Sequence, residues 1–358
     1  MKIVHIVEAW KGGIATYLEA LIIGQLDNGY EVHLLCDEKL FLDDPRDLGG
    51  CIVHHYQSTR KLWSLAKPIS QVSEAITRIA PDIVHAHSTF PGFYTRTRLN
   101  RLSKVIYTPH AWSFLKKDVP CGTRYIYKLC ERVLAHNCDA IICMSLEEAT
   151  AGRRIGIPNN KIHTICTGIP DSQSIHVEDL PSMHLAKKST LTFGYFGRLD
   201  YQKGFDRVVK AFRLLNSNYH LHVFGAPVRH DSSLMVTNED TNIHMHGWVS
   251  NAVMQSRLAK VDAVLIPSRW EGFALVPIEA MRASKAIFVS NDCSLREVVI
   301  DGFNGKIFNT STPEEIATII MSQTKEELLR LGANGRIVYK NCYTFDSFLK
   351  KIEAVYAS

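Results

Sequence analysis

The sequence predicts an α/β fold made of two parallel sheets, each covered by helices on both faces. At 358 residues the chain is too long for one ordinary hydrophobic core. Short apolar runs alternate with amphipathic stretches through both halves, an alternation typical of doubly wound sheets. A polar stretch without periodicity separates the halves. We therefore expect two similar domains with a linker between them.

In the first half, apolar runs that contain β-branched residues predict strands, and amphipathic stretches predict helices. The expected strands are KIVHIV (2–7), EVHLLC (31–36), DIVHAH (82–87), KVIYTP (104–109) and DAIICM (139–144). The expected helices cover 14–27, 66–79, 121–136 and 145–154.

The second half repeats the scheme. Its expected strands are LTFGYFG (191–197), YHLHVFG (219–225), NIHMHG (242–247), DAVLIP (262–267) and AIFVSN (286–291). The predicted organisation is an N-terminal Rossmann-like domain over 1–170, a linker over 171–190, a second Rossmann-like domain over 191–340, and a C-terminal helix over 341–358, for which the N-terminal domain is a candidate packing partner. Two such domains would form a cleft between the carboxyl ends of their strands.

Composition narrows the class of protein. With 46% apolar and 22% charged residues, the chain has the balance of a globular protein. The opening MKIVHIVEAW is interrupted by Glu8 after a short apolar run, and no run approaches the ~18 apolar residues of a membrane span. Nine cysteines without a C-x-x-C pair indicate reduced thiols rather than zinc ligands or disulfides. We expect a cytoplasmic protein.

Basic residues concentrate between residues 96 and 132. That stretch holds nine cationic and two acidic side chains. Its own net charge therefore exceeds the +5 of the whole chain, and the rest of the chain is slightly negative. The cations are Arg96, Arg98, Arg101, Lys104, Lys116, Lys117, Arg124, Lys128 and Arg132. Aromatic residues lie among or beside them: Phe90, Phe93, Tyr94, Trp112 and Phe114. Either these are solvated helix faces, or the stretch meets an anionic substrate or an anionic membrane surface. Nucleic acid is not favoured, since no recognition motif is present.

Two strand-to-loop junctions could bind phosphate. Gly12 and Gly13 follow the first strand and open a helix, where backbone N–H groups can approach an anion; the alternative is a tight βα turn, and the pattern is not that of a dinucleotide site. Arg198 and Lys203 follow the strand ending at Gly197. A guanidinium fork and an ammonium could neutralise a diphosphate there, unless the loop is merely solvated.

Two glutamates bracket the start of a predicted helix. Pro277 suits a first helical turn, so the helix should begin near Val276, with Glu271 in the preceding loop and Glu279 in the first turn. The backbone N–H groups of Gly272, Phe273 and Ala274 should face the same cleft. Compensation of the helix dipole could explain Glu279, at ~0.5 kcal/mol, but not Glu271.

These residues identify a family resemblance. The chain resembles the retaining family-four glycosyltransferases of the GT-B fold, whose signature is a pair of glutamates spaced as Glu271 and Glu279 are. The likeness runs nearly end to end. It includes KGG (11–13), DIVHAHS (82–88), YTPHA (107–111), DAIICMSLEE (139–148), GRLDYQKG (197–204), HGWVS (246–250) and REVVIDGFNGKIF (296–308). The sequence departs from the family at Ser284, where glycine is common, at Ala286, where proline is common, and at Thr167, where asparagine is frequent.

The resemblance implies a GT-B architecture, with the two domains facing each other across a cleft, and roles for particular residues. Arg198 and Lys203 would bind the diphosphate of a nucleotide sugar, and Glu279 the ribose hydroxyls. Glu271 would contact the donor sugar. The remaining implied substrate contacts are Gly12, Gly13, His87, Gly247, Trp248, Gly272, Phe273, Ala274, Leu275 and Val276.

His110 is a further catalytic candidate by the same resemblance, close to the donor sugar. It could orient a hydroxyl or stabilise developing charge; the alternative is a structural histidine. His85 and His87 lie on the strand before it, and we expect them to face opposite sides of the sheet. On that expectation only one lines the cleft, and His87 is nearer the carboxyl end of the strand.

The resemblance also implies a mechanism. The acceptor hydroxyl would attack from the leaving-group face, with the departing diphosphate as the base, so that configuration is retained and no catalytic base on the protein is assigned. No Asp-X-Asp occurs in the chain, so we expect no metal and no cofactor, with fixed cations in their place.

The favoured function is transfer of a hexose or N-acetylhexosamine from a UDP-sugar, or less favourably a GDP-sugar, to a lipid-linked glycan at the inner membrane face. Such a reaction belongs to cell-surface polysaccharide or lipopolysaccharide biosynthesis. One alternative is a nucleotide-sugar 2-epimerase or a phosphorylase of the same fold. Another is a non-catalytic partner that binds a nucleotide sugar.

Overall fold

The chain folds into two compact units in a computed structural model, which describes all residues except 9, 11, 43–46, 98–101, 117–118, 172–189, 228–235, 238 and 293. Unit 1 comprises Met1–Pro170 together with Phe345–Ser358, and unit 2 comprises Asp171–Thr344. The linker expected over 171–190 lies almost wholly outside the described residues. Among the described helices, none combines the length and hydropathy that a membrane span requires.

Unit 1 is built on a seven-stranded parallel sheet in the order β3-β2-β1-β4-β5-β6-β7. Its strands are β1 (Lys2–Val7), β2 (Glu31–Asp37), β3 (Ile52–Tyr56), β4 (Ile83–His87), β5 (Lys104–Thr108), β6 (Ala140–Cys143) and β7 (Ile162–Thr164). Its helices are α1 (Gly13–Asp27), α2 (Glu38–Leu42), α3 (Ala66–Ile79), α4 (Thr89–Arg96), α5 (Cys121–Leu134), α6 (Leu146–Arg154) and α12 (Phe345–Ala357). The sequence had not singled out β3 or β7.

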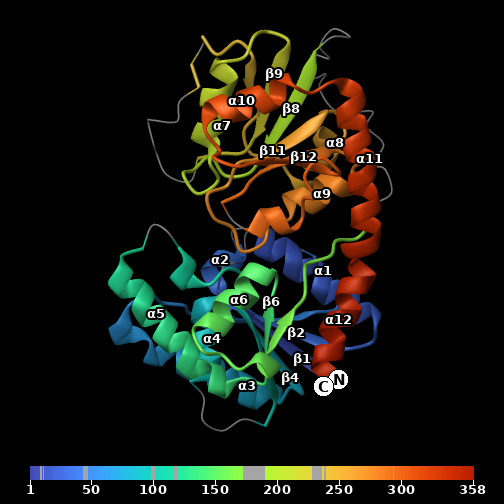
Figure 1. The fold of residues 1–358 in the computed structure, drawn as a ribbon. Helices are drawn as coiled ribbons and strands as arrows, with labels where there is room; N and C mark the ends of the chain where they lie inside the picture. The colour runs from blue at the N-terminus through green and yellow to red at the C-terminus, as the bar shows by residue number, and fades with distance from the viewer. Residues whose placement is uncertain are drawn as a thin grey trace. The chain divides into compact units, whose positions relative to one another are not determined.

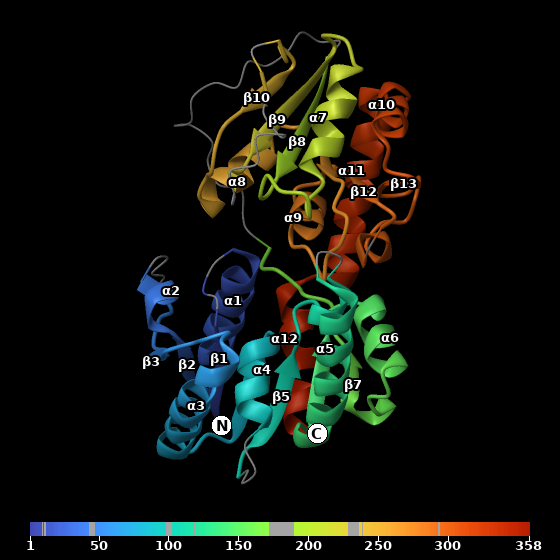
Figure 2. The same cartoon turned by 90° about the vertical axis from the view of Figure 1, so that its left-hand side faces the viewer.

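The two faces of this sheet differ. Alternate residues such as Val4 and Val84 point into an apolar core that also contains side chains of α3, α4 and α6. The residues between them face α1 and α12 instead, as His5 does toward Gln25 of α1. Figures 1 and 2 show α12, the red end of the chain, among the blue and green elements of unit 1.

Helix α12 is tied to unit 1 by specific contacts. A Cβ on Gly24 of α1 would lie 2.6 Å from the ring of Phe345, so the glycine lets the two helices approach closely. Lys104 Nζ donates to the carbonyl of Val355 at 2.8 Å and thereby caps the carboxyl end of α12. The final helix expected over 341–358 is therefore α12, while residues 341–342 belong to α11.

Unit 2 is built on a six-stranded parallel sheet in the order β10-β9-β8-β11-β12-β13. Its strands are β8 (Leu191–Phe196), β9 (Tyr219–Phe224), β10 (Ile243–Met245), β11 (Ala263–Ile266), β12 (Ala286–Ser290) and β13 (Gly305–Phe308). Its helices are α7 (Phe205–Arg213), α8 (Asn251–Leu258), α9 (Val276–Arg282), α10 (Pro313–Met321) and α11 (Lys325–Cys342). One face of the sheet forms an aromatic-rich core with α7 and α10. The described fold thus contains two doubly wound Rossmann-like sheets.

Candidate functional site

Each sheet has one point where the strand order reverses direction, between β1 and β4 in unit 1 and between β8 and β11 in unit 2. Doubly wound sheets bind ligands outside the carboxyl ends of the strands at such a point. The predicted site residues follow these strands or their neighbours. Gly12 follows β1, His87 ends β4, Arg198 follows β8 and Glu271 follows β11.

In unit 2, the loop after β8 is held by its own side chains. Arg198 is paired with Asp200, with Nε 3.3 Å from a carboxylate oxygen, and also donates to Gln202 at 2.9 Å. Asp200 accepts a hydrogen bond from the backbone N–H of Lys203 at 2.9 Å. The Arg198 side chain is still 41% exposed. The guanidinium is therefore oriented without being covered.

Gly204 locks this loop against the loop that follows β11. Its φ of +67° is a left-handed conformation, and an added Cβ would lie 2.1 Å from the carbonyl oxygen of Pro267. Gln202 reaches the same second loop, because its Nε2 donates to the carbonyl of Trp270 at 3.2 Å. The two loops that carry the predicted cations and the predicted carboxylate are consequently one packed structure.

Lys203 and Glu271 meet directly at this junction. Lys203 Nζ donates to Glu271 Oε1, and the two side chains are only 23% and 7% exposed. Ser268 Oγ donates to the same carboxylate oxygen at 2.9 Å, while Ser294 Oγ donates to the Gly272 carbonyl at 3.0 Å and fixes the loop from behind. Among the described residues none is seen to donate to Oε2, so the carboxylate keeps that oxygen for another donor.

Glu279 lies in the first turn of α9, which begins at Val276 with Pro277 after it, as predicted from the sequence. It is 5% exposed, and burial raises the pKa of its carboxyl group to about 7 against the opposing effect of Arg282. Gln255 Nε2 donates to Glu279 Oε1 at 3.5 Å. Dipole compensation at an exposed helix end does not describe such a buried group. Glu279 is a desolvated carboxyl with room for further hydrogen bonds.

The other predicted residues of unit 2 lie at the same edge of the sheet. Ala274 is buried just before α9, and the Phe273 ring lies 6.5 Å from that of Tyr343. Gly247 follows β10, and its carbonyl accepts from the Gly225 N–H at 2.8 Å, which ties that loop to the end of β9. Trp248 is 58% exposed. Leu275 precedes the helix as its N-cap residue.

In unit 1, Gly12 and Gly13 form the entry to α1. Gly12 is the N-cap residue with φ of +62°, and a Cβ there would meet no atom of the described residues within 4 Å, its chain neighbours aside. Before it, Glu8 is buried and receives two hydrogen bonds from Arg60, at 3.0 and 3.3 Å. Because Gly12 has no side chain, an anion can approach the backbone N–H groups at the amino end of α1.

A chain of hydrogen-bonded imidazoles leads from the sheet interior to His110. His5 Nδ1 lies 3.0 Å from His87 Nε2, and His87 Nδ1 lies 3.1 Å from His110 Nε2. At the inner end, His5 Nε2 lies 2.7 Å from Gln25 Oε1, while Gln25 Nε2 donates to the Tyr356 hydroxyl at 3.4 Å. Sequence reasoning had named His87 and His110 but had missed the other three members of this chain.

The direction of these hydrogen bonds follows from the amide. An amide oxygen can only accept, so His5 carries its proton on Nε2 and accepts at Nδ1. His87 must then donate from Nε2 and accept at Nδ1, and His110 must donate from Nε2. His110 therefore presents an unprotonated Nδ1, which makes no hydrogen bond with any described residue.

Burial keeps this chain of imidazoles neutral. It lowers the pKa of His5 to about 4 and that of His110 to about 3, and it holds the pKa of His87 well below its usual value. At neutral pH the His110 Nδ1 is consequently a hydrogen-bond acceptor and not a charge. It can accept from a hydroxyl group.

The expectation that His85 and His87 face opposite sides of the sheet is wrong. Residues two apart on a strand share a face, and the two rings lie 4.1 Å apart. His85 is engaged separately, with Nδ1 2.7 Å from the Tyr356 hydroxyl and Nε2 2.8 Å from Thr108 Oγ1. Ligand atoms of His5, His85 and His87 lie within 4.8 Å of one another. All their ring nitrogens already have partners within the chain, so a metal ion would have to displace them.

Backbone strain marks the same edge of unit 1. Ser88, His110 and Ala111 have φ of +71°, +51° and +84°, a region that non-glycine residues rarely adopt. The structure holds them there: the Ser88 N–H donates to the Thr108 carbonyl at 2.9 Å, and the Ala111 N–H donates to a carboxylate oxygen of Glu148. Such strain is characteristic of functional sites.

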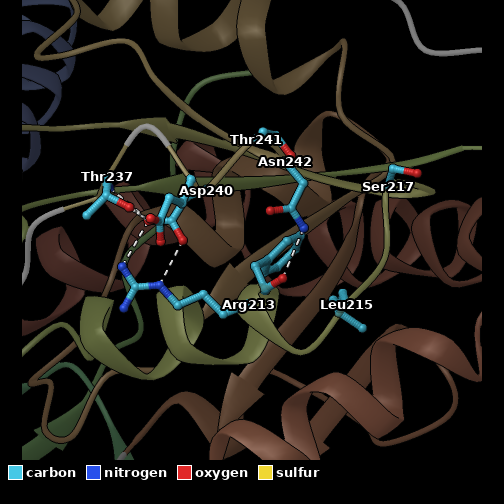
Figure 3. Close-up of a pocket in the computed structure, with 9 residues that line it drawn as sticks. Arg213, Leu215, Ser217, Thr237, Asp240, Thr241 and Asn242 are labelled. Carbon is cyan, nitrogen blue, oxygen red and sulfur yellow. Dashed lines mark hydrogen bonds and ion pairs between the residues drawn. The ribbon is translucent and has the colours of Figure 1, made fainter.

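A pocket of about 580 Å³ lies at the opposite, amino-terminal edge of the unit 2 sheet. Figure 3 shows that Arg213 and Asp240 satisfy one another within it, with hydrogen bonds of 2.7 and 2.9 Å. Asn242 in turn donates to the Phe212 carbonyl at 3.0 Å. Arg213, Asp240 and Asn242 are thus engaged in structural contacts, and none of the predicted site residues lines the pocket.

Two family profiles match the chain. Residues 11–173 match "Glycosyltransferase Family 4" and residues 177–337 match "Glycosyl transferases group 1". Together the two matches span nearly the whole chain, and each coincides with one of the two sheets. The two profile matches and the two Rossmann-like sheets define a glycosyltransferase, and the chain belongs to the family-four glycosyltransferases of GT-B fold.

Individual relatives agree with this assignment. An uncharacterized 41.2 kDa protein in the cps region of Klebsiella pneumoniae is 29% identical over 334 residues, covering 90% of each chain. The Escherichia coli UDP-Gal:alpha-D-GlcNAc-diphosphoundecaprenol alpha-1,3-galactosyltransferase is 23% identical, covering 87% of this chain and 83% of its own. In structure, sucrose-phosphate synthase from Thermosynechococcus elongatus superposes with a TM-score of 0.82 at 17% identity, covering 100% of this chain and 98% of its own.

Proposed function

We propose that this glycosyltransferase moves a hexose or N-acetylhexosamine from a nucleoside diphosphate sugar to a lipid-linked glycan, with retention of configuration. The contact between Lys203 and Glu271, beside Arg198 at the switch point of unit 2, carries the proposal. UDP is favoured over GDP, and a polyprenyl diphosphate acceptor is favoured, because the E. coli relative has both in its name. The cps-region relative supports a role in cell-surface polysaccharide biosynthesis.

In this proposal each charged group of the site has its own task. The Lys203 ammonium and the Arg198 guanidinium receive the diphosphate oxygens, and Glu271 accepts hydrogen bonds from the donor sugar. When no nucleotide sugar is bound, Glu271 holds the Lys203 ammonium in place. When it is bound, the ammonium also contacts the diphosphate, and the Glu271 carboxylate accepts hydrogen bonds from sugar hydroxyls. Glu279 accepts hydrogen bonds from the ribose, which favour its ionised form.

In the reaction, the acceptor hydroxyl forms a bond to the anomeric carbon as the bond from that carbon to the diphosphate oxygen breaks. The acceptor proton passes to the departing diphosphate, whose added charge is stabilised by Arg198 and Lys203. No metal or cofactor is required in this scheme, because two cations oppose the diphosphate. In unit 1, the unprotonated Nδ1 of His110 is suited to accept a hydrogen bond from a hydroxyl group, and the backbone at Gly12 and Gly13 is suited to approach an anion.

The reaction is placed in the cytoplasm, where the acceptor lipid would be met at the inner membrane face. A 2-epimerase or a phosphorylase of this fold remains the second candidate. An epimerase would consume the nucleotide sugar without an acceptor, and a phosphorylase would need orthophosphate. A non-catalytic binding protein is the third, and turnover of any donor would exclude it.

A thermal-shift screen against UDP, GDP and ADP identifies the base. A ligand at 100 times its dissociation constant stabilises the protein by ~2.7 kcal/mol, so the correct nucleotide should raise the Tm and the others should not. Equal shifts with all three, or with none, would contradict the donor assignment.

Substitution of Glu271 tests the catalytic assignment. We expect Glu271→Gln to lower kcat/KM by roughly 10²–10³, the usual loss for one polar group that acts in the transition state, while the protein stays folded. Asp240→Asn is the matched control, because it also removes a buried carboxylate from an ion pair, the one with Arg213 at the opposite edge of the same sheet. Wild-type turnover in Glu271→Gln would remove that residue from the site.

A further inference from the structure

Helix α12 brings one phenol into the interior of unit 1. Tyr356 lies in the last turn of this helix and is buried. Its ring stands at 90° to the ring of His85, with the ring centroids 5.7 Å apart. Lys104 Nζ holds the end of the helix by donating to the carbonyls of Val355 and Tyr356, at 2.8 and 3.3 Å. The Tyr356 hydroxyl therefore has a fixed place beside β4.

Lys104 belongs to the basic stretch over 96–132, part of which is thus structural. Arg96 of the same stretch is fully buried. The aromatic residues that are buried in the core of unit 1 are Tyr94, Trp112 and Phe114. The cations that lie outside the described residues are Arg98, Arg101 and Lys117.

The Tyr356 hydroxyl connects two polar groups of unit 1. Its oxygen lies 2.7 Å from His85 Nδ1 and 3.4 Å from Gln25 Nε2. Burial holds the pKa of Tyr356 well above its usual value and that of His85 well below its own. The hydroxyl therefore keeps its proton and the imidazole stays neutral. This single O–H proton can be donated to only one of the two neighbours.

The Tyr356 hydroxyl donates to His85. A phenolic O–H is a stronger donor than the N–H of a neutral imidazole, and an imidazole nitrogen is a stronger base than a phenolic oxygen. The contact with His85 is also the shorter of the two. Because His85 accepts at Nδ1, it carries its own proton on Nε2, which lies 2.8 Å from Thr108 Oγ1, a hydroxyl oxygen that can accept.

This donation fixes the orientation of the Gln25 amide. The Tyr356 oxygen now offers only lone pairs to Gln25, and only the NH2 end of an amide can donate to them. The amide oxygen is therefore left to face His5 Nε2, at 2.7 Å. The opposite orientation would set the amide oxygen against the phenol lone pairs. It would also reverse every hydrogen bond of the histidine chain, so that His110 would carry its proton on Nδ1.

We propose that Tyr356 is a positioning residue for His110, because its hydroxyl orients Gln25 and thereby keeps His110 Nδ1 unprotonated. The effect passes from the Gln25 amide through the hydrogen bonds of the histidine chain. The inference rests on the proposed function for the purpose of this nitrogen, which is to accept from a sugar hydroxyl. The tautomer itself is a property of unit 1 and can be measured without substrate.

Nitrogen-15 NMR of the full-length protein with labelled histidines tests the proposal. In Tyr356→Phe either end of the Gln25 amide can face the ring, so the His110 signals should change from the Nε2-protonated form to a mixture of both tautomers. With about half of the molecules in each form, kcat/KM should fall about twofold or more. Phenylalanine keeps the ring that packs on His85, so the variant should fold.

Tyr56→Phe is the matched control for the loss of a buried hydroxyl. The Tyr56 hydroxyl donates to the Val7 carbonyl at 3.2 Å and makes no contact with the histidine chain among the described hydrogen bonds. This substitution should change neither the His110 signals nor kcat/KM.

A second substitution separates orientation from packing. Gln25→Glu, added to Tyr356→Phe and measured at pH 8, replaces the amide by a carboxylate, which can only accept when it is ionised. The double variant should return His110 to the Nε2-protonated form and raise kcat/KM again. If Tyr356 acted only by packing α12 on unit 1, Tyr356→Phe would lower activity without changing the tautomer, and Gln25→Glu would not restore it.

Two results would overturn the proposal. One is a Tyr356→Phe protein in which His110 stays wholly protonated on Nε2, and the other is a double variant in which the mixture persists. If wild-type protein turned over no nucleotide sugar, the proposed function would fail, while the NMR spectra would still decide the role of Tyr356.

Discussion

The carboxyl-terminal edges of the two sheets carry opposite kinds of chemistry. In unit 1 the edge ends in a line of buried, neutral imidazoles, from His5 through His87 to His110. In unit 2 it ends in charged groups that neutralise one another, Lys203 with Glu271 and Arg198 with Asp200. The imidazoles of unit 1 are therefore suited to polar, uncharged hydroxyls, and the cations of unit 2 to an anion. The same strand topology supports both, because the chemistry lies in the loops.

The largest expected effect concerns Glu279, a buried carboxyl group of unit 2. The pKa of Glu279 is about 7 in the folded protein, against an ordinary 4.5. The folded state therefore holds the proton more tightly, and this residue makes stability fall as pH rises from 4.5 to 7. Glu279→Gln removes the ionisation cost, of about 3 kcal/mol. Urea unfolding at pH 5 and pH 8 should show the variant more stable than wild type only at pH 8.

Glu315→Gln is the control of opposite sign. Backbone and side-chain hydrogen bonds around residues 309–311 hold the pKa of Glu315 below its usual value. Glu315→Gln should lower the free energy of unfolding at pH 8, and this loss should become smaller as the pH falls toward the depressed pKa.

Equal stability of wild type and Glu279→Gln at both pH values would show that Glu279 is not desolvated. The variant should also bind UDP more weakly, since an amide is a poorer acceptor for ribose hydroxyls.

The next prediction concerns the neutral edge of unit 1. In wild type, nitrogen-15 NMR should show His110 protonated at Nε2 and bare at Nδ1. Gln25→Met removes the acceptor that orients the chain, and we expect a mixture of His110 tautomers with kcat/KM lowered about tenfold, the loss of one well-placed hydrogen bond. Gln25→Glu keeps an acceptor and should restore the tautomer.

His33→Gln provides the matched control, because His33 Nδ1 and His54 Nε2 form a similar pair, 2.9 Å apart, at the far edge of the same sheet. It should change neither the His110 signals nor turnover. A wild-type His110 with its proton on Nδ1 would contradict the direction assigned to the whole chain.

The smallest expected effect concerns backbone strain at two residues with positive φ, one beside His110 and one after α9. Ala111 has φ of +84° beside His110, and Ser284 has φ of +58° after α9, where the family commonly has glycine. Glycine at either position relieves the strain, so Ala111→Gly and Ser284→Gly should each raise the free energy of unfolding by up to about 1 kcal/mol. Only Ala111→Gly should lower turnover, because it frees the backbone that positions His110. Equal kinetics in both variants would deny a role to the Ala111 strain.

Local patterns predicted much of the fold and of the charged edge. Apolar runs located ten strands, and Pro277 located the start of α9 and hence the setting of both glutamates. The direct contact of Lys203 with Glu271 was not predictable, because it depends on β8 and β11 being neighbours. Ser268 lies three residues before Glu271 and could have been suspected as its donor. The histidine chain forms only because β1 pairs with β4 and because α12 packs on unit 1. Both contacts join residues far apart in the sequence, so no local pattern could predict them.

The return of α12 to unit 1 has a consequence for synthesis on the ribosome. Residues 1–170 emerge first, but the helix that covers their sheet emerges after all of unit 2. Until Tyr356 leaves the exit tunnel, His85 and Gln25 lack their hydroxyl partner, and an apolar surface of α1 stays open. All residues of the second unit are therefore synthesised before the first unit is complete. A nascent chain halted before Phe345 would join a complete unit 2 to an incomplete unit 1, whose open apolar surface is prone to aggregate.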